Sequence, residues 1–256
     1  MKPVLFFVHG LWATPATFTR LRARFEALGY ATHAPALPFH DRDPGLPPVP
    51  EIGTLTIEDY ARFLVAEVEA LGCPPVIIGH SMGGMLAQIV AARTEHAGLV
   101  LLSTAATATT VSPGFATLRT MAGVVTQWGW WREPTRIAYN AARWGIYNGV
   151  PEDIAQAEFA GLVWDSGRVI AEMTLPAVSA TGATKVDYAR LGKPALVIVG
   201  TADRITVPGI SRATARKLRG IVDYHELAGV GHWLFWGDTE VKVGDWIERW
   251  LGQFAT

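Results

Sequence analysis

The sequence contains a single cysteine, Cys73, among 256 residues, so no disulfide can form within the chain. This scarcity favours a reducing compartment, and we expect a cytoplasmic protein. The first apolar run, Val4 to Val8, is too short for a signal-peptide core and lacks a small-residue cleavage site. No stretch approaches the roughly eighteen uncharged apolar residues that a membrane span requires. We therefore expect neither a secreted nor a membrane-spanning protein.

An excess of charge of either sign is also lacking. The chain has 22 Lys and Arg against 23 Asp and Glu, a net charge of −1. This balance gives no electrostatic reason to expect nucleic acid or an anionic membrane surface as a partner. The seven histidines are scattered without metal-ligand spacing, and no G-x-G-x-x-G turn is present. We expect no metal and no cofactor, but a small-molecule partner; the sequence gives no sign of oligomeric state.

Strand and helix patterns alternate along the two ends of the chain, and half of its residues are hydrophobic. This alternation predicts an α/β fold with a mostly parallel sheet of about six strands flanked by helices. From about residue 104 to 191 the pattern breaks, and five tryptophans crowd among helix-compatible segments. We expect a core of residues 1–104 and 191–256, interrupted by an inserted helical cap at 105–190. The predicted strands are 4–8, 30–35, 76–78, 99–102, 195–199 and 222–227, and the helices begin near 14, 57, 85 and 241.

A glycine-rich turn joins the predicted strand 76–78 to the helix after it. Its sequence, Gly79-His80-Ser81-Met82-Gly83, fits the G-x-S-x-G pattern of a turn that presents a serine nucleophile. The backbone of so sharp a turn is strained, and side chains at positions 79 and 83 would collide with the neighbouring strand and helix. The alternative is a turn that merely joins strand to helix. The strand before the motif and the helix after it favour the nucleophile.

A serine nucleophile needs a base and an acid that orients the base. Among the histidines, His232 lies between glycines in the loop after the last predicted strand, and Asp203 follows the strand 195–199. Because the carboxyl ends of parallel strands share one edge, both would converge on Ser81. Each is alternatively a turn residue without a catalytic role. Asp187 and Asp165 are weaker candidates for the acid, since neither ends a clear strand.

Two backbone N–H groups are candidates for binding the anionic intermediate. The residue after the nucleophile, Met82, supplies one by the geometry of the turn. The loop His9-Gly10-Leu11-Trp12 follows the first strand and supplies the other, at Leu11. An ordinary tight turn is the alternative for that loop.

Together these features resemble the α/β-hydrolase superfamily over nearly the whole chain. The resemblance rests on the His9-Gly10 loop, the serine turn, Gly200-Thr201-Ala202-Asp203 and Gly231-His232. It implies Ser81 as nucleophile, His232 as general base and then acid, and Asp203 as the orienting carboxylate. It also implies that the tryptophan-rich insertion is a helical cap over the pocket. Because the first predicted strand begins at residue 4, we expect the antiparallel strands that often open this fold to be missing.

A serine esterase that forms an acyl-enzyme is the leading hypothesis. The substrate would be a small to medium ester with an apolar or aromatic group, because the cap is rich in aromatic residues. Lactone hydrolysis, carbon–carbon bond hydrolysis and perhydrolysis use the same three residues and remain alternatives, as does a non-catalytic receptor for a small ligand. Trp12 and Trp233 adjoin the catalytic loops and are the best candidates for substrate contact.

The remaining candidates for substrate contact are His80, Trp128 and Trp131. His80 adjoins Ser81, although its ring is expected to point away from the serine. The cap tryptophans could instead pack the cap's own core.

Overall fold

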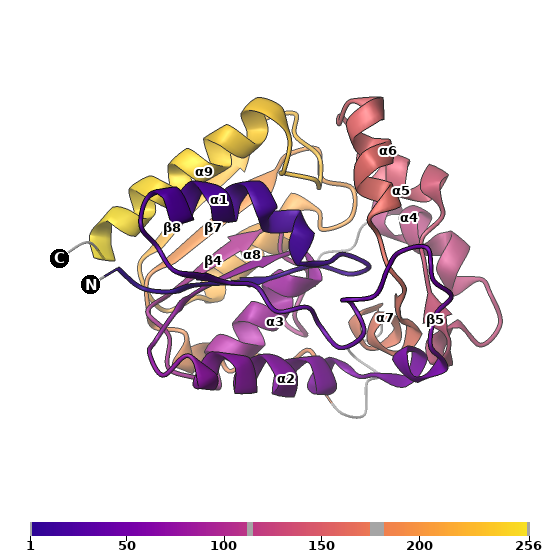
Figure 1. Cartoon of the computed structure of the whole chain (residues 1–256), viewed down its shortest axis with the longest axis horizontal. Helices are drawn as coiled ribbons and strands as arrows, with labels where there is room; N and C mark the ends of the chain where they lie inside the picture. The colour runs from indigo at the N-terminus through magenta and orange to yellow at the C-terminus, as the bar shows by residue number, and fades with distance from the viewer. Residues whose placement is uncertain (1, 112–114, 175–181, 255–256) are drawn as a thin grey trace.

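A six-stranded sheet lies at the centre of the computed structural model, which describes residues 2–111, 115–174 and 182–254 (Figure 1). The strand order is β2-β1-β3-β4-β7-β8, and every neighbouring pair is parallel. This architecture confirms the predicted parallel sheet. The strands are β1 Leu5–Val8, β2 Thr32–His33, β3 Val76–His80, β4 Gly98–Leu102, β7 Ala195–Gly200 and β8 Val222–Leu227.

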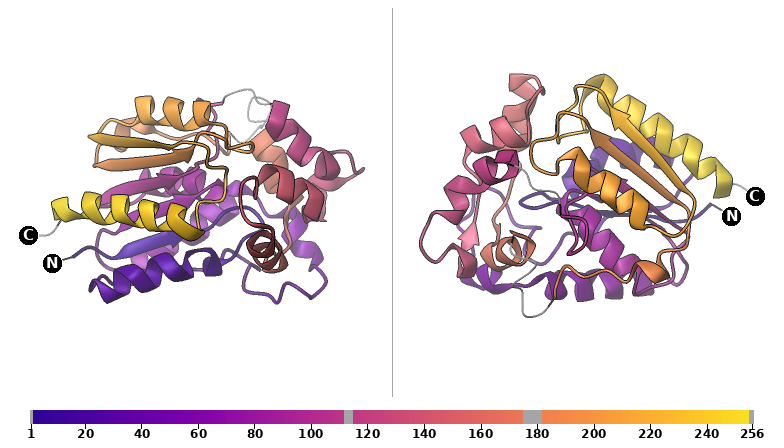
Figure 2. Two further views of the ribbon diagram at one scale, coloured as in Figure 1. Left: turned by 90° about the horizontal axis from the view of Figure 1, so that it is seen from above. Right: turned by 180° about the vertical axis from the view of Figure 1, so that it is seen from behind.

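Helices cover both faces of this sheet (Figures 1 and 2). One face carries α1 (Thr19–Ala27) and α9 (Gly237–Leu251), and the other carries α2 (Ile57–Ala70), α3 (Met82–Ala91) and α8 (Pro208–Lys217). Successive residues of a strand point to opposite faces. Accordingly, Leu5 and Phe7 pack in one hydrophobic cluster, and Phe6 and Val8 in the other. The two clusters hold the sheet between its helices.

Two local features differ from the sequence pattern. Thr14 accepts a hydrogen bond from Ala16 N–H as the predicted N-cap, but the turn it opens, η1 (Pro15–Phe18), is a 3₁₀-helix that precedes α1. Helix α8 was not predicted. Its buried residues are Ile210, Ser211 and Thr214, of which only the first is apolar. The segment therefore has no apolar stripe from which a helix could be recognised.

The chain between β4 and β7 forms a separate group of helices beyond the carboxyl ends of the strands (Figure 1). A two-stranded antiparallel sheet joins its parts. Such short strands leave no periodic signal in a sequence, which is why none was expected here. Residues 112–114 and 175–181 of the predicted cap lie outside the described residues, and its boundaries, 105–190, remain a prediction. The elements are α4 Phe115–Val125, β5 Pro134–Thr135, α5 Tyr139–Gly145, α6 Glu152–Ala160, β6 Asp165–Ser166 and α7 Gly167–Thr174.

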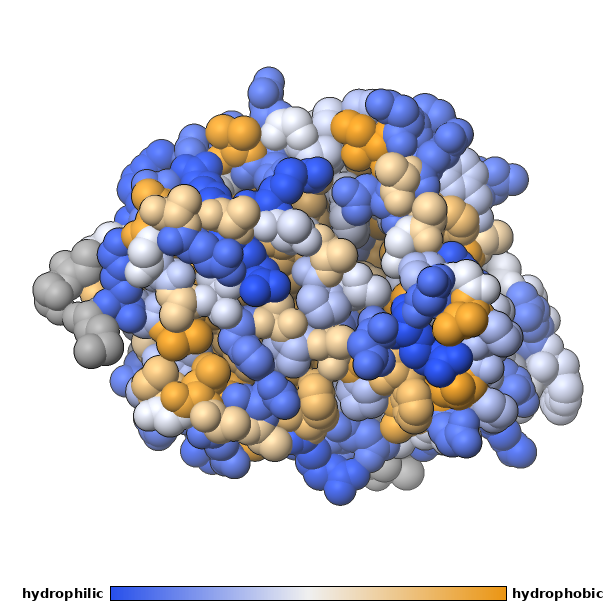
Figure 3. Space-filling model, in the orientation of Figure 1, coloured by the Kyte–Doolittle hydropathy of each residue, from blue (hydrophilic) through white to orange (hydrophobic). Residues whose placement is uncertain are grey.

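Short 3₁₀-helices complete the list of elements: η2 Pro50–Thr54, η3 Trp130–Arg132, η4 Tyr188–Arg190 and η5 Gly252–Phe254. On the face seen in Figure 3, hydrophobic residues are scattered among hydrophilic ones. Within the described ranges, no helix is both long enough and apolar enough to cross a bilayer.

Candidate active site

Ser81 lies between β3 and α3 in a strained backbone conformation, with φ of 57° and ψ of −124°. A non-glycine residue in such a region costs about 1–3 kcal/mol. Backbone hydrogen bonds to the next strand offset part of this cost. Ser81 N–H donates to the Leu102 carbonyl at 3.0 Å, and the Ser81 carbonyl accepts from Ala105 N–H at 2.8 Å. The turn is thus fixed to the end of β4.

Two glycines permit this turn for the steric reason expected from the sequence. A Cβ at position 79 would lie 2.2 Å from the carbonyl oxygen of Gly83, and a Cβ at position 83 would lie 2.1 Å from that of Val8. Both separations are far inside van der Waals contact. Helix α3 therefore approaches β1 and β3 at positions where only glycine fits.

His232 and Asp203 form a buried pair, with His232 Nδ1 2.8 Å from Asp203 Oδ2. The other oxygen, Oδ1, accepts from the N–H groups of Ile205 at 2.9 Å and Thr206 at 2.8 Å. Since these amides fix the carboxylate, it holds the imidazole with Nδ1–H toward Asp203 and leaves Nε2 free to accept a proton. The Thr206 hydroxyl also lies 2.8 Å from Oδ2 and donates to the Ser103 carbonyl.

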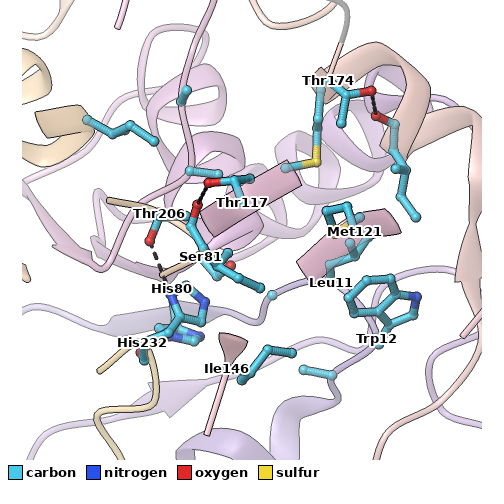
Figure 4. A pocket seen from close by; sticks show the side chains of 18 of the residues that line it. Leu11, Trp12, His80, Ser81, Thr117, Met121, Ile146, Thr174, Thr206 and His232 are labelled. Carbon is cyan, nitrogen blue, oxygen red and sulfur yellow. Dashed lines mark hydrogen bonds between the residues drawn. The ribbon is translucent and has the colours of Figure 1, made fainter. Parts of the chain in front are cut away.

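A cavity of about 470 Å³ lies between the carboxyl ends of the strands and the inserted helices. Ser81 and His232 both line it (Figure 4). No hydrogen bond joins their side chains within the part of the chain that the structure describes, as is common for catalytic pairs before substrate binds. Aliphatic and aromatic side chains make up most of the wall, and none of the described lining residues is Asp, Glu, Lys or Arg. The cavity therefore suits an uncharged ligand.

The loop that carries Leu11 passes close to the serine turn. A Cβ on Gly10 would lie 3.0 Å from Ser81 Cβ, so this loop and the serine are in contact. Neither the Leu11 N–H nor the Met82 N–H donates a hydrogen bond to another group among residues 2–111, 115–174 and 182–254. Both amides are therefore available to a ligand, as an oxyanion site requires.

Three of the five predicted substrate contacts, Trp12, Trp233 and His80, line the cavity. The structure does not bring Trp128 and Trp131 to it. Trp128 is 93% exposed, and Trp131 borders a separate surface groove. Gly129 adopts φ of 83° between them, and the short turn after it directs Trp130 toward the cavity in their place.

His80 is buried and contacts the candidate base. Its Nε2 lies 3.2 Å from the His232 carbonyl, and the two rings are 4.9 Å apart. Burial, together with the nearby His232, lowers the pKa of His80 well below its ordinary value. A neutral His80 therefore donates its Nε2–H to the backbone of His232. The ring lies against the loop that carries the candidate base, with its centroid 5.7 Å from that of Trp233.

Sequence reasoning missed a second buried cluster, formed by His9, His40, Tyr60 and Asp165. His40 Nε2 lies 3.0 Å from Asp165 Oδ2, and the Tyr60 hydroxyl donates to Oδ1 at 2.7 Å. His9 Nε2 accepts from Leu37 N–H at 3.1 Å and so joins the end of β1 to the segment at Leu37. No spacing in the sequence links these residues.

Comparison with known proteins places the chain. The sequence model described as "Alpha/beta hydrolase family" matches residues 5–242. No curated protein matches the chain.

In the described residues, no group of three or more His, Cys, Asp or Glu side chains could hold a metal ion.

Solved structures with similar folds include a monoacylglycerol lipase from Paleococcus ferrophilus, which is 22% identical with a TM-score of 0.69. That match covers 97% of this chain and 93% of the lipase. A methylesterase from Arabidopsis, MES16, is 14% identical with a TM-score of 0.71, covering 98% and 99%. A pyrethroid hydrolase from Sphingobium faniae JZ-2 is 17% identical with a TM-score of 0.67, covering 98% of each chain. At these identities the likeness is one of fold.

Proposed function

Because the chain belongs to the alpha/beta hydrolase family, we propose that it is a serine hydrolase that cleaves carboxylic esters. One observation carries this proposal: a serine on a strained turn and a buried His–Asp pair line the same uncharged cavity. The family includes several reactions, and the chemistry of these three residues favours acyl transfer.

In the proposed mechanism, Ser81 attacks the ester carbonyl carbon while His232 Nε2 takes the hydroxyl proton. Asp203 keeps the imidazole in the required tautomer and stabilises the imidazolium that forms. The N–H groups of Leu11 and Met82 bind the tetrahedral oxyanion, a contribution of about 3–4 kcal/mol per donor in serine hydrolases. His232 then protonates the leaving alcohol, and the acyl group remains on Ser81. Water, activated by the same histidine, releases the acid.

The proposed substrate is an uncharged ester with an apolar or aromatic group. The cavity has room for a small to medium substrate, and Trp12, Trp233 and Met121 add aromatic and apolar area to its wall. The insertion at 105–190 acts as a cap in this proposal, because α4 and α7 supply side chains on the side of the cavity that faces the serine turn.

A panel of p-nitrophenyl esters of increasing acyl length, with Ser81→Ala as the control, tests the reaction. We expect turnover of the neutral esters that Ser81→Ala abolishes, and stoichiometric labelling of Ser81 by a fluorophosphonate probe. Absence of turnover above buffer on every ester would overturn the esterase proposal. Absence of labelling as well would favour a ligand receptor.

A matched pair of esters tests the charge preference. A p-nitrophenyl alkanoate and the analogue that ends in a carboxylate differ only in the charge brought into the cavity. Since the described wall offers no cation to pair with it, we expect kcat/KM for the charged ester to be lower by about 100-fold or more. Equal values would contradict an uncharged acyl site.

A further inference from the structure

Asp165, on β6, is fully buried and lies outside the proposed triad. Its carboxylate faces four donors, one on the neighbouring Ser166 and three from other parts of the chain. Oδ1 accepts from the Tyr60 hydroxyl at 2.7 Å and from Ser166 N–H at 2.7 Å. Oδ2 accepts from Trp12 N–H at 2.8 Å and pairs with His40 Nε2 at 3.0 Å. A carboxylate of the insertion is thereby bound to the loop after β1.

The insertion holds Trp12 through both of its backbone polar groups. In addition to the Asp165 contact, the Trp12 carbonyl accepts from Val163 N–H at 2.7 Å. Trp12 needs such anchors because its φ is 61°, a left-handed conformation that is unfavourable for a residue with a side chain. These two hydrogen bonds act together with the bond from Ala13 N–H to the Gly10 carbonyl, which closes the turn that contains Trp12, to oppose a return to an ordinary conformation.

The strained residue adjoins the proposed oxyanion donor. On the other side of Leu11, the Gly10 carbonyl accepts from the His9 ring at 3.0 Å and from Ala13 N–H at 3.2 Å. Leu11 therefore lies between two fixed residues, one held by the core and one by the insertion. A displacement of about 1 Å in such a group is enough to cost about 100-fold in rate.

The surroundings of Asp165 keep its carboxylate charged. Burial alone would raise the pKa of Asp165. The charge of His40 and the hydrogen bonds that the Asp165 carboxylate accepts outweigh burial, so the pKa of Asp165 lies below its ordinary value. Burial would lower the pKa of His40, yet Asp165 outweighs it and raises that pKa. His40 Nδ1 lies 3.0 Å from the Pro38 carbonyl, so both ring nitrogens face acceptors, as in an imidazolium. A charged carboxylate is the stronger acceptor for Trp12 N–H.

We propose that Asp165 is a positioning residue for the reaction: through Trp12 it fixes the loop that presents the Leu11 N–H to the oxyanion. The insertion thus sets the geometry of the oxyanion site in addition to covering the cavity. This inference rests on the proposed hydrolase function.

Replacement of the carboxylate by a side chain of the same shape tests the proposal. Asp165→Leu leaves no acceptor for Trp12 N–H. Asparagine would be a weaker test, because rotation of its amide could place its oxygen against that N–H. We expect kcat to fall about 100-fold with KM within about threefold of wild type, because an oxyanion contact acts mainly in the transition state. Binding of a trifluoromethyl ketone, whose adduct with Ser81 carries the oxyanion, should weaken in parallel. The kinetic constants and the ketone affinity are both referred to the concentration of active sites, which the fluorophosphonate probe titrates.

Tyr60→Phe is the matched control. It removes a hydrogen bond to the same buried carboxylate while leaving the Trp12 contact in place. We expect its kcat to remain within about threefold of wild type. Unchanged kcat in folded Asp165→Leu, or an equal loss in Tyr60→Phe, would overturn the positioning role.

The wild-type protein provides a test that needs no variant. We expect the Trp12 amide proton to resonate far downfield and to exchange much more slowly than that of Leu11, which has no acceptor among the described residues. Equal exchange rates would overturn the anchor even if Asp165→Leu does not fold. A wild-type protein inactive on all esters would instead overturn the hydrolase function, while slow Trp12 exchange would still show the anchor.

Discussion

Asp203 and Asp165 are buried aspartates near the serine turn, and their neighbours separate their roles. Asp203 contacts the imidazole of His232, whereas Asp165 contacts the backbone of Trp12. The third candidate from the sequence, Asp187, is exposed and accepts from Ala189 N–H at the start of η4. Position relative to the histidine, rather than residue type, therefore makes Asp203 the proposed acid.

Asp203→Asn is expected to lower kcat by about 10⁴-fold, because an amide cannot hold His232 in the tautomer that accepts the serine proton. Steady-state kinetics on the best ester of the panel measures this loss. Asp187→Asn, with an activity near that of wild type, is the control. If Asp203→Asn kept a tenth of the activity, Asp203 would not be the orienting acid.

His232 and Asp203 could be located from the sequence because each follows a strand whose apolar run is recognisable. Parallel strands bring such positions to one edge of the sheet, so residues far apart in the chain converge. His40 and Asp165 follow no such rule. Their contact depends on how the loop at 38–50 and the insertion fold against each other, and neither residue type nor spacing records that packing.

At the level of elements, the core was predictable and the orientation of the insertion was not. Buried strands and amphipathic helices have periods that a sequence shows directly. The three tryptophans at 128, 130 and 131 lie around a left-handed glycine and a short 3₁₀ turn, where no helical period applies. The turn at Gly129 therefore determines which of the three faces the cavity. Trp130 lines it, and Trp128 and Trp131 do not.

Helix α3 is expected to tolerate no side chain where it crosses β1. In Gly83→Ala, the new Cβ would lie 2.1 Å from the Val8 carbonyl oxygen, and we expect the free energy of unfolding to fall by about 3 kcal/mol. Gly123→Ala is the matched control, since that glycine is exposed within α4 with nothing near its missing Cβ. Its helix propensity should stabilise the protein by up to about 1 kcal/mol. Urea unfolding compares the two, and a Gly83→Ala variant as stable as wild type would contradict the close approach.

At the scale of the whole molecule, several histidines are buried in the folded state, and they do not titrate alike. Burial, and then the charge of His40, lowers the pKa of His9 to about 3. Burial, and then His232, lowers that of His80 well below its ordinary value. His40 is the exception, because Asp165 raises its pKa. His40 and Asp165 therefore form a buried charged pair, and His9 and His80 are buried neutral imidazoles.

These two neutral imidazoles make the fold sensitive to acid. Below pH 6.5 the unfolded chain takes up protons on His9 and His80, while the folded chain does not until much lower pH, so stability falls as pH falls. The raised pKa of His40 acts in a different window: its contribution is complete below pH 6.5 and is lost only as pH rises through the folded-state value. Asp165 loses its contribution only as pH falls below 3.8. Between pH 7 and pH 5 the loss from His9 and His80 is therefore expected to reach up to about 4 kcal/mol.

Urea unfolding at pH 7 and pH 5 measures this loss, and His9→Gln provides the matched variant. Glutamine retains a donor for the Gly10 carbonyl and an acceptor for Leu37 N–H, the two contacts that His9 makes, but it does not titrate. The variant is expected to be less stable at pH 7 and to show a smaller pH dependence than the wild type, because residue 9 then no longer takes up a proton on unfolding, whereas His80 and His96, whose pKa values burial also lowers, still do. If the variant and the wild type lost equal stability between the two pH values, His9 would be protonated in the folded protein. A protonated His9 would lie 5.1 Å from the charged His40 ring, and its Nε2 could not accept from Leu37 N–H. Other contacts would then have to hold the loop that precedes Leu11.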